Sequence, residues 1–259
     1  MLDKTSMPLL YRAAQYSVYG QRNEVESAGI TDAMFVYLDG SPSPKSIDNL
    51  DRNYRLRPLV CLTRAWEQFI KKTFPNAHVY KRYMMKPAYQ FLTDGEIVLP
   101  EGFQVALFDE KAFALNPFSH GENYPSFAEY QEHGAGAVVW HNDKIVASAS
   151  SFITVNNEIE LDVSTEEAYR GKGLASACIS LMLQDCAKRG IIVHWDAQNE
   201  TSLHLAEKFG FEQEYAYSVY FLPKRITDET VVLLSQRKSD DYVEVELEPA
   251  FPEKERIDK

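Results

Sequence analysis

The residues with the clearest chemical potential form a short glycine-rich segment, Arg170-Gly-Lys-Gly-Leu-Ala175, between a predicted strand and a predicted helix. The first turn of a helix leaves several backbone N–H groups unpaired, and the helix dipole adds partial positive charge there. Gly171 and Gly173 have no Cβ, so a ligand can approach the backbone closely, and Arg170 and Lys172 can add positive charge. The segment therefore predicts a phosphate or pyrophosphate site. A tight turn with two surface cations is the alternative interpretation.

Two common phosphate-binding motifs fit this segment poorly. A P-loop needs its lysine to be followed by serine or threonine, whereas Lys172 is followed by Gly173. A dinucleotide-binding fingerprint, G-x-G-x-x-G, needs a third glycine where this chain has Ser176. We therefore set both motifs aside.

The elements that must position this segment alternate between strands and helices from about residue 97 onward. The residue patterns predict strands at 103–108, 136–141, 144–155, 158–163, 191–196 and 215–222, and helices at 171–188 and 201–209. Upstream, an amphipathic helix is predicted at 63–74. The alternation predicts an α/β or α+β domain from about residue 97 onward.

The composition argues against several classes of function. With 27 basic and 38 acidic side chains, the formal net charge of −11 disfavours a general nucleic-acid binder or a protein held on anionic lipid. No stretch has the roughly 18–20 apolar residues of a membrane helix, and the N-terminus lacks the pattern of a secretion signal. Cys61, Cys178 and Cys186 have no metal-ligand spacing and indicate reduced thiols in a cytoplasmic protein. We expect no metal, nucleic-acid partner or membrane partner.

The segment from Arg170 to Ala175 resembles the acetyl-CoA pyrophosphate signature of the GNAT superfamily of N-acetyltransferases, R/Q-x-x-G-x-G/A. A second stretch, Trp195-Asp-Ala-Gln-Asn199 followed by Ser202, resembles the second cofactor-binding block of that superfamily. More narrowly, the pattern resembles a subfamily with an N-terminal extension that includes zwittermicin-type antibiotic self-resistance acetyltransferases. The specific resemblance covers about residues 97–222.

The resemblance implies an α/β (α+β) fold with a GNAT-like mixed central β-sheet flanked by helices, preceded by a smaller mixed N-terminal domain. In this sheet the strands at 158–163 and 191–196 would splay apart, with acetyl-CoA between them. The pantetheine arm would pair with the backbone of residues 161–165 like an added strand. The residues expected to bind the cofactor are Val163, Thr165, Arg170, Gly171, Lys172, Gly173, Leu174, Ala175, Asn199 and Ser202. For Asn199 and Ser202, helix capping is the alternative role.

The resemblance also implies a division of the chain into three parts. An N-terminal domain at 1–96 would shape the substrate cleft, and a GNAT catalytic domain at 97–235 would bind acetyl-CoA. An acidic tail at 236–259 would follow, without an assigned function.

Acetyl transfer requires that the amine lose a proton, because an alkylammonium has a pKa near ~10. We expect Glu160 to be the general base. Glu158, Glu160 and Asp162 alternate with aliphatic residues and so share one strand face, although a bulge would reverse that orientation locally. The alternative is a carboxylate row that faces solvent or bonds to the N-terminal domain. His194 is the second candidate base, with a hydrogen-bonded core histidine as its alternative.

The leaving thiolate calls for a proton donor. Many superfamily members carry a tyrosine seven residues after the asparagine of the second block, where this chain has Ala206. Either water assists the thiolate, or a tyrosine of the next strand reaches in. Among Tyr215, Tyr217 and Tyr220 we expect Tyr217, with packing as the alternative role for each.

The leading interpretation is an N-acetyltransferase that transfers the acetyl group of acetyl-CoA to a primary amine of a small molecule. Two alternatives stay open: a protein or peptide N-acetyltransferase, and a noncatalytic acyl-CoA-binding module. The second alternative follows from the missing tyrosine at Ala206. Whether the chain forms a homodimer is left open.

Overall fold

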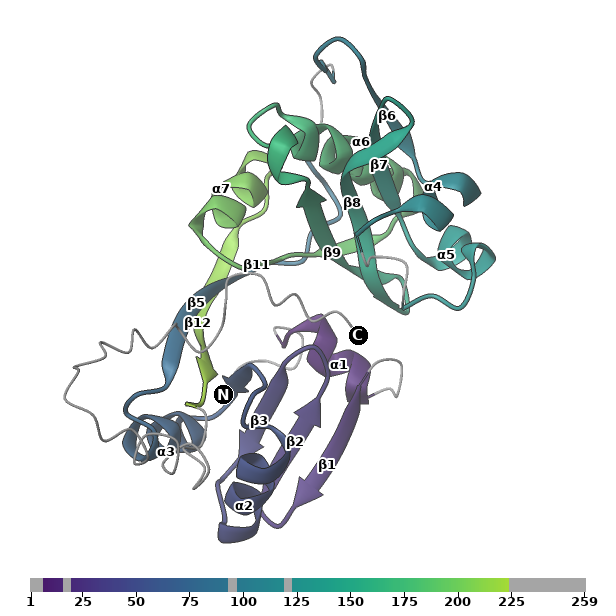
Figure 1. Cartoon of the computed structure of the whole chain (residues 1–259). Helices are drawn as coiled ribbons and strands as arrows, with labels where there is room; N and C mark the ends of the chain where they lie inside the picture. The colour runs from purple at the N-terminus through teal and green to yellow at the C-terminus, as the bar shows by residue number, and fades with distance from the viewer. Residues whose placement is uncertain (1–6, 16–19, 93–96, 119–122, 224–259) are drawn as a thin grey trace, which may run out of the picture.

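The computed structural model describes residues 7–15, 20–92, 97–118 and 123–223. The expected acidic tail at 236–259 lies outside these residues. Two β-sheets with flanking helices make up the described chain (Figure 1). The predicted mixed α/β architecture is confirmed. No helix within these ranges is long and apolar enough to cross a membrane.

The first sheet has five strands, and one of them leads into the glycine-rich segment. Its order is β10 (Ile192–His194), β9 (Glu158–Thr165), β8 (Lys144–Val155), β7 (Gly136–His141) and β6 (Phe103–Leu107). The β9–β10 pair is parallel and the other pairs are antiparallel. The strand predictions from residue 103 to residue 163 are therefore confirmed to within a few residues.

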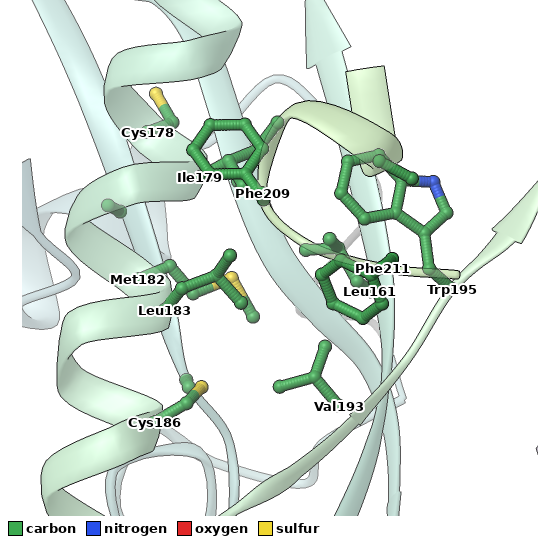
Figure 2. Close-up of a cluster of buried hydrophobic side chains, with 14 of the residues drawn as sticks. Leu161, Cys178, Ile179, Met182, Leu183, Cys186, Val193, Trp195, Phe209 and Phe211 are labelled. Carbon is green, nitrogen blue, oxygen red and sulfur yellow. The ribbon is translucent and has the colours of Figure 1, made fainter. Parts of the chain in front are cut away.

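Helix α6 (Leu174–Arg189) covers one face of this sheet. Its buried stripe packs against Leu161 of β9, Val193 of β10, and Trp195 (Figure 2). Cys178 and Cys186 are fully buried in this core. Two short helices, α4 (Glu110–Leu115) and α5 (Phe127–His133), complete this part of the molecule. The buried face holds the start of α6 in a defined place beside β9.

The second sheet has seven strands. Its order is β1 (Gln21–Val25), β2 (Ala28–Asp32), β3 (Val36–Gly40), β4 (Leu59–Cys61), β12 (Gln213–Phe221), β5 (His78–Met85) and β11 (Asp196–Ala197). The helices that accompany it are α1 (Leu9–Gln15), α2 (Pro44–Asn53), α3 (Arg64–Thr73) and α7 (Glu200–Lys208). The helix predicted at 63–74 is confirmed as α3, which begins after Thr63, whose side chain caps it.

The seven-stranded sheet combines strands from both sides of residue 96. Strand β12 lies between β4 and β5, and its pairing with β5 extends from Gln213 to Phe221 (Figure 1). Strand β11 then pairs with the other edge of β5. The division of the chain into domains at residue 96 stays a prediction. The seven-stranded sheet contains strands from before and from after this boundary.

The two sheets separate where the sequence places the candidate chemistry. Strands β9 and β10 pair over three residues only, ending with His194 opposite Glu160. After Trp195 the chain enters β11 and pairs with β5, while β9 continues to Thr165 beside β8. The register irregularity lies in β8, between Ser151 and Ile153, opposite the middle of β9. The structure therefore has the splay between these strands that the resemblance implies.

Candidate active site

The glycine-rich turn leaves the start of α6 open to a ligand. Gly173 is the N-cap residue with φ 78°, Gly171 has φ 76°, and neither has an atom within 4 Å of where a Cβ would stand. No side chain caps α6, and its first turn has no acidic residue. The backbone N–H groups of this 16-residue helix thus meet open space, which suits an anion.

Some residues around the turn hold it in place, and others have groups that a ligand can contact. Leu174 is 1% exposed and anchors the helix in the core, so it can offer a ligand only its backbone. Arg170 donates from Nε to the Thr165 carbonyl oxygen at 3.3 Å. The Thr165 hydroxyl is buried and has no hydrogen-bond partner among the described residues. The orphaned hydroxyl and the uncapped helix together fit the expected pyrophosphate-bearing cofactor. The assignment of these residues to cofactor binding stays a prediction.

A cleft of about 760 Å³ adjoins this turn and is lined by Tyr80, Arg82, Arg170, Gln198 and Asn199. It joins the glycine-rich turn, the start of α7 and strand β5, which come from three separate parts of the sequence. Arg82 contributes to this cleft from β5, although its side chain is only 14% exposed. The N-terminal region therefore contributes a wall of this cleft.

Asn199 and Ser202 have structural partners in this conformation. The Asn199 side chain accepts from the Ser202 backbone N–H at 2.9 Å and caps α7. The Ser202 hydroxyl accepts from Trp195 Nε1 at 3.1 Å. Asn199 still lines the cleft. Capping is therefore observed for Asn199, and a role of either residue in cofactor binding stays a prediction.

Glu160 lies at the base of the splay and is only 6% exposed. Its Oε1 accepts from the Asp196 backbone N–H at 3.1 Å. Burial, reinforced by the nearby Asp196 carboxylate, raises the pKa of Glu160 to about 8. A carboxyl group with that pKa is matched to accepting a proton near neutral pH. The alternative of a row of solvent-facing carboxylates does not describe Glu160.

Asp196 holds a compact group of side chains next to Glu160. Arg82 donates from Nε to Asp196 Oδ1 at 3.2 Å and from Nη2 to the Asp196 carbonyl oxygen at 2.9 Å. The Tyr217 hydroxyl donates to Asp196 Oδ2 at 2.5 Å. Burial and the Asp196 carboxylate raise the pKa of Tyr217 well above its usual value. Tyr217 would have to give up this bond to protonate a thiolate, so its role as general acid stays a prediction.

The other tyrosines of β12 lie in different settings. Tyr220 donates to Glu67 of α3 at 3.3 Å and is buried in the core beneath that helix. Tyr215 lies near Tyr217, with ring centroids 6.1 Å apart. Ala206, at the position where many superfamily members carry tyrosine, is fully buried. Tyr220 is therefore the tyrosine of the three that is least able to reach the splay.

Glu158 and His194 form a separate ion-pair group with the N-terminal helix. Arg12 of α1 donates to both oxygens of Glu158, at 3.2 and 2.5 Å, and His194 Nε2 lies 2.6 Å from Glu158 Oε2. The hydrogen bond from His194 and the charge of Arg12 lower the pKa of Glu158 to about 2. His194 is thus the hydrogen-bonded core histidine named above as its alternative role, and Glu158 is the carboxylate that bonds to the N-terminal region.

Sequence reasoning missed Arg82 and Asp196 as parts of the site. Asp196 stands inside the Trp195–Asn199 block but was given no role. Arg82 shares a face of β5 with Tyr80, because side chains alternate along a strand. The available signal was that Arg82 shares its strand face with Tyr80 and Met84 and so with an aromatic and an apolar residue. The partner that makes it part of the site, Asp196, is 114 residues away.

The fold is a pair of mixed sheets, and in one of them two strands splay apart near a helix whose start no side chain caps. A family model for GNAT acetyltransferases matches residues 16–220. The chain therefore belongs to the GNAT acetyltransferase family, whose members use acetyl-CoA.

Individual relatives agree with this assignment. An uncharacterized N-acetyltransferase of Bacillus subtilis, YdfB, is 31% identical over 129 residues, and the match spans 48% of this chain and 49% of that protein. The crystal structure of a GCN5-related N-acetyltransferase-like protein from Streptococcus suis covers 83% of this chain and 93% of its own, with 26% identity and a TM-score of 0.70. A GCN5-related N-acetyltransferase from Kribbella flavida shares the fold, with a TM-score of 0.57, 12% identity, and coverage of 86% and 99%.

Proposed function

We propose that this chain transfers the acetyl group of acetyl-CoA to a primary amine of a small molecule. The observation that carries the proposal is the buried carboxyl group of Glu160 at the base of the splay, on the strand that leads to the uncapped start of α6. The uncapped helix start suits an anionic carrier, and the carboxyl group suits the removal of a proton from an amine. The narrower resemblance to the zwittermicin-type subfamily is kept as part of this proposal.

The free edge of β9 and the turn would hold the cofactor, which supplies the acetyl group as a thioester. Beyond Glu160, β9 pairs with β8 on one side only, so its other edge can pair with an extended ligand. The Val163 N–H donates to the Asp162 carboxylate at 2.8 Å, and it would exchange this bond for one to the thioester oxygen. We infer that the backbone from 161 to 165 orients the thioester and stabilises negative charge on its oxygen.

Glu160 would accept the proton of the amine. Its pKa of about 8 is closer to the pKa of an alkylammonium, near ~10, than that of an ordinary carboxyl group, which makes the transfer less unfavourable. The base must be ionised, so kcat/KM should rise with pH through about 8. Tyr217 is proposed as the donor to the departing thiolate, in exchange for its bond to Asp196.

The location of the cleft favours a small acceptor. Its walls come from β5, the glycine-rich turn and the start of α7. Arg82 in this wall bonds to Asp196, whose backbone N–H donates to Glu160. An amine must pass between these side chains to reach the carboxyl group. A free amine on a narrow chain can do this more easily than a folded protein surface.

The test is the release of free thiol from acetyl-CoA in the presence of a panel of amines. Release that depends on a small primary amine supports the proposal. Release with peptides alone would assign the chain to peptide acetylation. Tight acetyl-CoA binding with no amine-dependent release, from pH 6 to pH 9, would favour a noncatalytic binding module.

A further inference from the structure

Tyr37 of β3 carries a hydroxyl group that the fold leaves without a partner. The residue is fully buried, and its hydroxyl makes no hydrogen bond within the described part of the chain. A buried hydroxyl without a partner destabilises the folded protein, so buried hydroxyls are almost always hydrogen-bonded. Tyr130, also buried, follows that rule, since its hydroxyl donates to the Ala135 carbonyl at 2.8 Å and lies 2.5 Å from Ser150 Oγ.

The Tyr37 side chain faces the place where the two sheets meet, around the side chains of Glu160 and Asp196. We call this place the junction. It packs in one apolar cluster with Tyr217 and Ile153, and Ile153 lies directly opposite Glu160 in the β8–β9 register. Its hydroxyl interacts electrostatically with the carboxyl groups of Asp196 and Glu160. The orphaned hydroxyl is therefore directed into the junction and away from solvent.

The other polar groups of the junction already have partners there. Asp196 accepts from Arg82 and Tyr217, and its backbone N–H donates to Glu160 Oε1. Glu160 Oε2 accepts no hydrogen bond from the described residues. Two groups thus remain for a ligand: the hydroxyl of Tyr37 and the second oxygen of Glu160.

We propose that Tyr37 is an acceptor-binding residue, and that its hydroxyl and Glu160 Oε2 hold the substrate amine between them. This inference rests on the proposed function. One N–H of the amine donates to the Tyr37 oxygen, and the proton that must leave passes from nitrogen to Glu160 Oε2. The nitrogen lone pair so formed bonds to the acetyl carbon, and the carbon–sulfur bond breaks. The nitrogen loses a second proton as the amide forms. Of the two protons that the ammonium group loses in all, Glu160 keeps one, and the other balances the proton that the departing thiolate takes up.

The geometry explains why a hydroxyl is kept at this buried position. Two hydrogen-bond acceptors fix the orientation of a small amine better than one. The hydroxyl contributes nothing to the free protein through hydrogen bonding and becomes useful when the amine is bound. Substrate binding and stability should therefore respond differently when it is removed.

The experiment compares Tyr37→Phe with Tyr130→Phe, because each removes one buried hydroxyl and keeps the ring. For Tyr37→Phe we expect the KM for the acceptor to rise about tenfold, which corresponds to about 1.4 kcal/mol. The KM for acetyl-CoA should stay unchanged, and the melting temperature should not fall. Tyr130→Phe should lower the melting temperature and leave the acceptor KM unchanged.

Two results would overturn the inference. One is a Tyr37→Phe enzyme with the acceptor KM of the wild type. The other is a fall in its melting temperature as large as that of Tyr130→Phe, because the hydroxyl would then be a structural group. If the wild type releases no thiol with any amine, the proposed function fails, and this inference fails with it. If the wild type is active and Tyr37→Phe is indistinguishable from it, this inference alone fails.

Discussion

The glycine-rich turn and the junction around Glu160 are built in opposite ways. The turn uses backbone N–H groups at the start of one helix, and its conformation depends on two neighbouring residues, Gly171 and Gly173. The junction uses side chains from β3, β5, β9, β11 and β12, which only the folded chain brings together. A site made of backbone can be recognised in a short stretch of sequence. A site made of distant side chains cannot.

Within β9 the same contrast separates two glutamates. Glu158 and Glu160 share a strand face, yet burial raises the pKa of Glu160 to about 8, and hydrogen bonds from His194 and Arg12 lower that of Glu158 to about 2. The alternation along the strand predicted the shared face. The direction of each shift depends on whether a positive partner compensates for the loss of water.

The largest effect should come from Gly173→Val, with Gly190→Val as the matched control. Both glycines have positive φ, 78° and 68°, with open space at the Cβ position, at opposite ends of α6. Each change should destabilise the protein by about 1–2 kcal/mol or more, because L residues are strained there. We expect only Gly173→Val to lose measurable coenzyme A binding in calorimetric titration. Equal binding by both variants would refute the turn as the pyrophosphate site.

Glu160→Gln should lower kcat/KM by about 10²–10⁴-fold, because the amide cannot accept the proton. The rise of the wild-type rate through pH 8 should also disappear. The folded-state pKa of Glu160 lies above its ordinary value of 4.5, so wild-type stability should fall as pH rises from 4.5 to about 8, a loss absent from Glu160→Gln.

Glu158→Gln is the control on the same strand for that variant. It should keep most activity and lose about 2 kcal/mol at neutral pH, since Arg12 and His194 lose a charged partner. The lowered pKa means that wild-type stability from Glu158 is present above pH 4.5 and lost toward pH 2. Chemical denaturation across this range measures both variants. Equal rates for the two variants would remove Glu160 as the base.

The smallest effect separates the two roles of Asn199. Asn199→Asp keeps an oxygen that can cap α7, whereas Asn199→Ala removes it and should cost about 1 kcal/mol of stability. If the amide also binds the cofactor, both variants should raise the KM for acetyl-CoA, by less than about tenfold. An unchanged KM in both would leave Asn199 with capping alone.

Much of the fold could be predicted because its signals are local. The strand alternation in β9, the apolar stripe of α6 and the cap at Thr63 each depend on residues a few positions apart. The composite sheet could not be predicted in this way. Nothing in the residues of β12 indicates that it inserts between β4 and β5.

The sequence by itself determined the glycine-rich turn, the helix behind it and the family resemblance, because helix starts and glycine conformations depend on neighbouring residues. The tertiary structure decided that Glu160 is buried next to Asp196 and that the Arg82 side chain is largely buried. It also decided that the Tyr37 hydroxyl faces the junction without a hydrogen-bond partner among the described residues. Burial and charge pairing are properties of surroundings, and here those surroundings come from strands more than a hundred residues apart.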